Sequence, residues 1–127
     1  MKAQVASSLI RFEATAAGGR ARFRFAAGLP VLAGHFPGAP IVPGVFLIEA
    51  VRLAAERRAG RPLRISEVRE ARFSAPVEPE RDLDLEFSLV EGPACWSCRA
   101  EARLSDVAAG KFRLELVPRI GDSGASV

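Results

Sequence analysis

The stretch PGVFLIEAVRLAAERRAG, residues 43–60, determines what the rest of the chain must build. Pro43 suits a helix start, where its missing N–H costs no hydrogen bond, and Gly60 suits a helix end. The sequence therefore predicts a helix over residues 45–59. Its first three turns carry apolar side chains on nearly every side, whereas a surface helix keeps a broad polar face. Other structure must therefore surround this helix.

The segments around the helix are typical of antiparallel strands. In RARFRFAA, residues 20–27, Phe23 and Phe25 alternate with Arg22 and Arg24, which predicts a half-buried strand. The segment 5–17 is ambiguous and is best read as a strand. Further strands are predicted over residues 63–75, 83–90, 95–104 and 111–117. One buried helix among these strands predicts an α+β fold, with an antiparallel sheet that curves around the helix.

Length and composition are those of one globular domain. The 127 residues are 49% hydrophobic and 26% charged, and we expect a single domain over residues 1–118 with a disordered tail over residues 119–127. No apolar run reaches about 18 residues, so no membrane span is expected. The N-terminus lacks the pattern of a secretory signal, which favours a cytoplasmic location. A net charge of +3, scattered along the chain, does not indicate nucleic-acid binding.

Two local patterns allow more than one interpretation. Cys95 and Cys98 have the C-x-x-C spacing of redox and metal motifs, but on a strand they would point to opposite faces. No second cysteine pair exists to complete a zinc site, so no metal site is expected. A cluster of arginines forms either a solvated helix end or a surface for an acidic protein partner. Its members are Arg52, Arg57, Arg58, Arg61 and Arg64.

The chemistry-bearing residues gather before and inside the helix. Four prolines and four glycines make residues 28–44 an ordered loop, which holds His35, the only histidine and a natural base near neutral pH. Gly44 leaves the first backbone N–H groups of the helix open to a polarised oxygen. Glu49 follows among apolar neighbours, which would favour its protonated form. The alternatives are a structural histidine, an ordinary helix start and a Glu49–Arg52 pair.

The order of these residues resembles a known family. The pattern G-H-F-P-G-x-P-x-x-P-G-V-x-x-x-E-A, residues 34–50, resembles the signature of the 3-hydroxyacyl-acyl-carrier-protein dehydratases of the FabZ/FabA type. The spacings from His35 to Gly44 and to Glu49 match that family. The later stretch ARFSAPVEPERDL, residues 71–83, is similar to its second strand and turn. The resemblance covers roughly residues 20–117.

This resemblance implies a hot-dog fold, a homodimer and an activity. His35 from one subunit would remove the C2 proton of a (3R)-3-hydroxyacyl thioester carried by acyl carrier protein. The Gly44 amide would polarise the thioester carbonyl, while Glu49 of the other subunit would protonate or orient the departing 3-hydroxyl. The product would be a trans-2-enoyl thioester, made without metal or redox cofactor. Other residues implied are Phe36, Pro43 and Val45 at the substrate, and Arg52, Arg57, Arg58 and Arg61 at the carrier protein.

Two alternatives to this activity remain open. Leu53 stands four residues after Glu49, where the family usually has glutamine, and the chain is short. Shortened relatives occur in polyketide and aryl-polyene pathways, where some are catalytically silent partners of an active subunit, as heterodimers or larger oligomers. The third candidate is an acyl thioesterase, because fold does not determine function.

Overall fold

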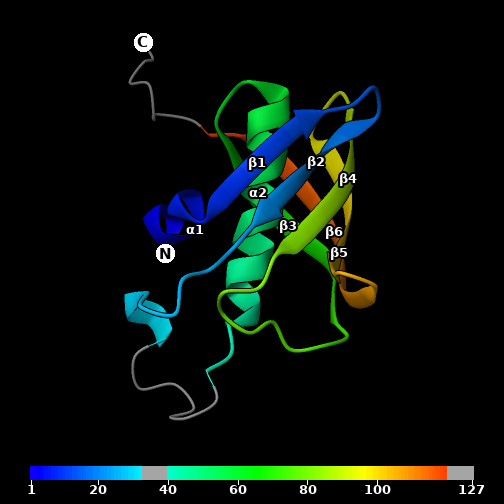
Figure 1. Cartoon of the computed structure of the whole chain (residues 1–127). Helices are drawn as coiled ribbons and strands as arrows, with labels where there is room; N and C mark the ends of the chain where they lie inside the picture. The colour runs from blue at the N-terminus through cyan, green and yellow to red at the C-terminus, as the bar shows by residue number, and fades with distance from the viewer. Residues whose placement is uncertain (33–39, 120–127) are drawn as a thin grey trace.

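The protein consists of one long helix wrapped by a single sheet, with two short helical segments beside them (Figure 1). The structure, a computed structural model, describes residues 1–32 and 40–119. Its six strands form an antiparallel sheet in the order β1-β2-β4-β5-β6-β3, so the predicted α+β class is confirmed. The helices are α1 (Lys2–Ser7), the 3₁₀ turn η1 (Pro30–Leu32) and α2 (Gly44–Ala59). The strands are β1 (Leu9–Ala14), β2 (Gly18–Phe23), β3 (Leu63–Phe73), β4 (Leu83–Glu91), β5 (Trp96–Leu104) and β6 (Val107–Pro118).

Helix α2 begins and ends where its flanking residues require. Pro43 precedes it with extended backbone (φ −60°, ψ 144°), and Gly60 ends it in the left-handed region at φ 73°. That conformation carries a steric cost for residues with a Cβ, which explains the glycine. The predicted helix over residues 45–59 is confirmed to within one residue.

One side of α2 fills the core, and the opposite side does not. The core side packs against α1, β2, β3, β4 and β6 through fully buried side chains. These are Phe46, Leu47, Ala50, Val51, Ala54 and Ala55. On the outward side Val45 is 51% exposed, and Ile48 and Leu53 are only partly covered. A single chain therefore leaves part of this apolar helix open.

The strand predictions hold best where alternation is longest. The four predicted strands after the helix correspond to β3, β4, β5 and β6. Strand β2 ends at Phe23, earlier than predicted, but Phe25 stays fully buried and its ring stacks 6.1 Å from that of Phe23. The segment 5–17 contains β1, but α1 was missed because its six residues are too few to show a helical period.

The sheet has two free edges, β1 and β3. Strand β3 is eleven residues long and pairs only with β6, so its other edge presents unpaired backbone groups. Its side chains Val68 and Phe73 are 45% and 49% exposed. Long, partly apolar edges of this kind are templates for further strand pairing.

Two further expectations concern a membrane span and the C-terminal tail. Residues 1–32 and 40–119 contain no helix that is both long and apolar enough to cross a bilayer. Of the tail predicted over residues 119–127, only Arg119 is described, so the prediction for residues 120–127 lies outside the described residues.

Candidate active site

An apolar pocket opens beside the first turn of α2. It has a volume of about 400 Å³, and its walls come from the segment before the helix, the helix start and the chain that leaves β3. The backbone N–H of Val42 donates to the carbonyl of Val77 at 2.8 Å, which joins the two connecting segments. The lining residues are Ile41, Val42, Gly44, Leu47, Phe73, Ser74, Ala75, Pro76 and Val77.

An aromatic ring lies against Gly44. A Cβ built on Gly44 would stand 2.8 Å from two ring carbons of Phe73, closer than real Cβ contacts allow. The ring of Phe73 is held edge-on by Phe112, with centroids 5.6 Å apart. The sequence predicts a glycine that leaves room for substrate, whereas in the structure part of that room is taken by Phe73. The helix start therefore faces an aromatic wall of the pocket.

Glu49 lies one turn further along α2 and is buried with Arg52. Their exposed fractions are 6% and 5%. Nε of Arg52 donates to both carboxylate oxygens, at 2.9 and 3.0 Å, and Nη2 donates to Oε2 at 2.6 Å. Glu49 lies among apolar residues as expected, and the alternative of a Glu49–Arg52 pair is confirmed.

The guanidinium of Arg52 is also held from its other side. Its Nη1 donates at 2.9 Å to both Oε2 of Glu56 and the carbonyl oxygen of Leu63. Glu56 in turn accepts a hydrogen bond from the N–H of Leu63, again at 2.9 Å. These bonds, first those to Glu49, raise the pKa of Arg52 against the opposing effect of burial. We call these four residues, Glu49, Arg52, Glu56 and Leu63, the α2–β3 network.

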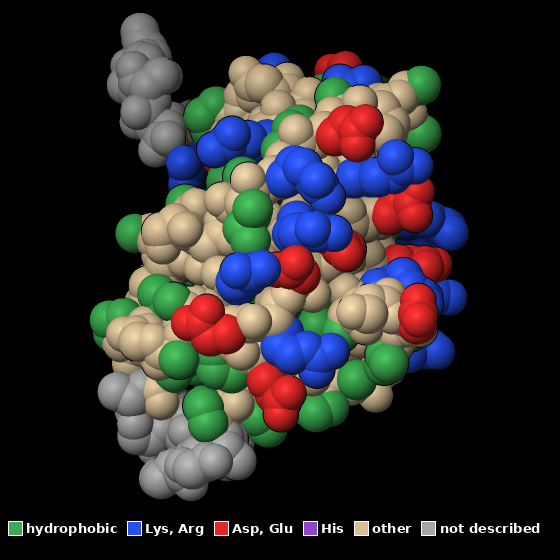
Figure 2. Space-filling model, viewed as in Figure 1, with side chains coloured by type: hydrophobic (Ala, Val, Ile, Leu, Met, Phe, Trp, Pro, Cys, Tyr) green, Lys and Arg blue, Asp and Glu red, His purple; other side chains and the backbone are tan. Residues whose placement is uncertain are grey.

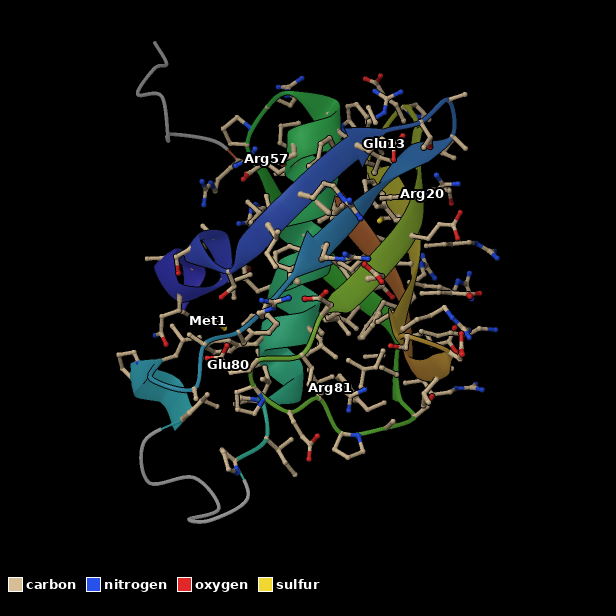
Figure 3. The ribbon with its side chains drawn as sticks, viewed as in Figure 1. Met1, Glu13, Arg20, Arg57, Glu80 and Arg81 are labelled. Atoms are coloured by element: carbon tan, nitrogen blue, oxygen red, sulfur yellow. The ribbon has the colours of Figure 1, made fainter. Side chains whose placement is uncertain are left out.

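The predicted arginine cluster is smaller than the sequence suggested. Arg52 is buried, so its assignment to a docking surface is wrong. Arg58 is half-buried, and its Nε and Nη2 donate to the carbonyls of Thr15 and Gly18 that close the β1–β2 hairpin. Arg57, Arg61 and Arg64 are exposed. Figure 3 shows Arg57 near the C-terminal end of α2. At the rise of an α-helix, Arg57 lies about 20 Å along the axis from Gly44.

Three arginines in and just after β2 form ion pairs with carboxylates, and they are Arg20, Arg22 and Arg24. Arg22 binds Asp84 at 2.7 Å and Arg24 binds Asp82 at 2.7 Å, and hydrogen bonding to Asp84 raises the pKa of Arg22. Arg20 lies 3.8 Å from a carboxylate oxygen of Glu13 across the hairpin. Figure 2 shows the result, with basic and acidic side chains interspersed over this face. The face therefore has no single sign of charge.

Glu80 is a structural residue that sequence reasoning missed. It adopts φ 64°, its backbone N–H donates to the carbonyl of Phe25, and its Oε2 accepts from the N–H of Ala27 (Figure 3). These bonds join the turn before β4 to the chain that leaves β2. No local pattern in the sequence marks these bonds, because they join residues more than 50 positions apart.

Four predicted site residues remain, and they are His35, Phe36, Pro43 and Val45. His35 and Phe36 lie outside the described residues. Pro43 caps α2, and Val45 is exposed in its first turn.

The two cysteines of the C-x-x-C pair are separated in the structure, with Cys98 inside β5 and Cys95 directly before the strand. Cys98 is buried, which raises its pKa to about 12, whereas Cys95 is partly exposed and its thiol donates to Glu115 at 2.7 Å. The hydrogen bond to Glu115 is also the main cause that raises the pKa of Cys95. Both cysteines are free thiols with little thiolate character.

Sequence comparison finds dehydratases among the relatives of this chain. The sequence pattern of the ApeI-like family, described as ApeI dehydratase, matches residues 12–114. The 3-hydroxyacyl-[acyl-carrier-protein] dehydratase FabZ of Anaeromyxobacter dehalogenans (strain 2CP-C) is 34% identical over 103 residues, which are 71% of this chain and 66% of that protein. FabZ of Chlamydia trachomatis serovar L2 is 43% identical over 72 residues, 48% of this chain and 47% of that protein. The chain thus spans about half to two thirds of the length of these curated relatives.

Solved structures share the fold at low sequence identity. The dehydratase heterocomplex ApeI:P from Xenorhabdus doucetiae superposes with a TM-score of 0.70 at 24% identity, covering 87% of this chain and 96% of that one. Cj0977, a sigma28-regulated virulence protein from Campylobacter jejuni, superposes with a TM-score of 0.71 at 13% identity, covering 94% and 88%. The expected hot-dog fold is confirmed.

Proposed function

This chain belongs to the ApeI-like dehydratase family, and on that premise we propose that it removes water from 3-hydroxyacyl chains carried by acyl carrier protein. The observation that carries the proposal is the arrangement along α2. Gly44 opens the helix onto an apolar pocket, and the buried carboxylate of Glu49 follows one turn later. The product is a trans-2-enoyl thioester, and the reaction changes no overall oxidation state, so it draws on no redox cofactor.

The start of α2 would bind the reacting thioester. The first N–H groups of a helix lack intrahelical acceptors and carry partial positive charge, which favours a carbonyl oxygen that gains negative charge. The apolar walls of the pocket suit an acyl chain. In this proposal His35 removes the C2 proton, and Glu49 acts at the 3-hydroxyl group. Phe36, Pro43 and Val45 would lie beside the substrate.

A second subunit would cover the open side of α2 and the free edge of β3. Val45 on the helix and Val68 and Phe73 on the strand are each close to half exposed, although they are large apolar side chains. Large exposed apolar groups on neighbouring elements mark interaction surfaces. We propose a homodimer in which each site combines Glu49 with His35 of the partner subunit. The alternative is a heterodimer with a related chain.

A first test follows carrier-bound substrate directly. Purified protein is incubated with 3-hydroxyacyl acyl carrier protein, and the carrier is analysed by mass spectrometry. Loss of water is the expected result. Release of free acid would indicate a thioesterase instead. An unchanged carrier would favour the second candidate function, a catalytically silent subunit. The observation that favours this candidate is the ion pair in which Arg52 binds the Glu49 carboxylate.

Gly44→Val is expected to lower kcat/KM by about tenfold or more with a smaller effect on folding. The new side chain would meet the Phe73 ring at the pocket wall, although valine costs only a few tenths of a kcal/mol in helix propensity. Steady-state kinetics and thermal unfolding measure the two effects. Gly28→Ala is the matched control, because a Cβ at Gly28 has nothing within 4 Å. Normal kinetics in Gly44→Val would remove the helix start from the site.

The exposed arginines in the last turn of α2 and just after it would dock the carrier protein. Arg57→Glu combined with Arg61→Glu is expected to raise KM for carrier-bound substrate several-fold, because reversed charges repel an acidic partner. The defect should weaken with added salt, which screens exposed charges. A short pantetheine thioester should be processed normally. Arg103→Glu, an exposed arginine bound to the carbonyl of Asp106, is the control. Equal defects on both substrates would contradict a docking role.

A further inference from the structure

The α2–β3 network leaves one part of the Glu49 carboxylate free. Among residues 1–32 and 40–119, Oε2 accepts hydrogen bonds from Nε and Nη2 of Arg52, whereas Oε1 accepts only from Nε. An ionised carboxylate has about four lone-pair sites. Oε1 therefore retains the capacity to accept another hydrogen bond, and Oε2 is occupied.

Arg52 fixes this carboxylate with little freedom to move. The planar guanidinium matches a carboxylate with two parallel N–H groups, and such charge-assisted bonds are short and strong. Glu56 and the Leu63 carbonyl hold the same guanidinium from the opposite side. Glu49 and Arg52 are both nearly inaccessible to solvent, so water does not compete with these bonds.

The position of Glu49 suits contact with a substrate bound at the helix start. It follows Gly44 by five residues, about 7.5 Å along the axis, and helical side chains tilt back towards the N-terminus. Val45, Ile48 and Leu53 surround it on the outward side of α2. Glu49 is only 6% exposed, so a substrate would have to reach Oε1 from the helix start.

We propose that Arg52 is a positioning residue that holds Glu49 as a carboxylate, so that Oε1 accepts a hydrogen bond from the 3-hydroxyl of the substrate. This inference rests on the proposed function and deepens it. Glu49 then orients the hydroxyl and does not supply a proton. The elimination still balances: the electron pair of the broken C2–H bond forms the C2–C3 double bond as the C3–O bond breaks, and the base that takes the C2 proton returns it to the departing hydroxyl, which leaves as water.

The test measures binding, so that it does not depend on turnover. Two amide-linked pantetheine analogues are compared by calorimetry, one with a 3-hydroxybutyryl chain and one with a butyryl chain. The wild type is expected to bind the hydroxylated analogue about tenfold more tightly, the scale of one hydrogen bond to a charged group. Arg52→Met should lose this preference to within about twofold. Its affinity for the butyryl analogue should stay unchanged, which a merely structural role does not predict.

Three further variants complete the comparison. Arg52→Lys keeps the charge without the planar fork, and it should restore part of the preference. Glu56→Gln loosens the guanidinium from behind, and it should reduce the preference without removing Arg52. Arg103→Met, at an exposed arginine, should retain the full preference. If Arg52→Met does not fold, Arg52→Lys and Glu56→Gln decide the question.

Several outcomes would overturn the inference. A wild type that binds both analogues alike, or neither, means that Glu49 accepts no bond from the hydroxyl. An Arg52→Met protein that weakens both analogues equally means that Arg52 acts only through the fold. A wild type that prefers the hydroxylated analogue, yet leaves carrier-bound substrate unchanged, contradicts the dehydratase proposal and keeps the role of Arg52.

Discussion

His35→Ala is expected to lower kcat for dehydration by at least about a hundredfold, since general acid–base groups contribute two to four orders of magnitude. No other histidine is present in the chain to replace it. Single-turnover mass spectrometry with carrier-bound substrate measures the loss. Circular dichroism and thermal unfolding of the same variant check that the protein still folds.

Two other results would change the role assigned to His35. Activity within a few-fold of wild type in His35→Ala would remove the imidazole from the mechanism. His35→Gln provides a second variant that keeps hydrogen-bonding capacity without a base near neutral pH. If His35→Gln is active and His35→Ala is not, the histidine serves as a hydrogen-bonding residue.

Mixing two inactive variants is expected to restore about a quarter of wild-type activity. If each site combines His35 of one subunit with Glu49 of the other, a dimer of His35→Ala with Glu49→Ala has one site with both mutations and one intact site. Random exchange makes half of the dimers mixed, and each mixed dimer has one of two sites intact, as two-fold symmetry requires. The measurement is activity after reversible dissociation, with exchange followed by native mass spectrometry.

The structure adds a control to this experiment. Glu49→Ala removes one of the two carboxylates that pair with the buried guanidinium of Arg52 and leaves Glu56, so the cost is expected to stay below the about 3–5 kcal/mol of a fully unpaired buried charge. Unfolding of this variant must therefore be measured before mixing. Confirmed exchange with no recovered activity would show that His35 and Glu49 do not act together across an interface.

The fold could be predicted from the sequence because its signals are local. The boundaries of α2 follow from Pro43 and Gly60, and the alternation of Phe23 and Phe25 places both rings inward. Helix α1 was missed because six residues are less than two turns, too few for a period to appear.

The site could be predicted only in part, since its decisive contacts are long-range. The i,i+3 spacing of Glu49 and Arg52 is visible in the sequence. The further bond from buried Arg52 to the Leu63 carbonyl is not, because Leu63 belongs to another element. The contact of Gly44 with Phe73 joins residues 29 positions apart, and Arg58 binds carbonyls about 40 positions away. No periodicity in a sequence reports such pairs.

The α2–β3 network lies entirely within residues 49–63 of one chain, and this has an evolutionary consequence. After a gene duplication, one copy could lose its histidine and keep a complete carboxylate half-site, because no bond of the network depends on the second subunit. The other copy would then need to retain only the histidine half. Divergence of a symmetric pair into two specialised chains therefore requires no compensating change in this network, and selection can act on each half separately.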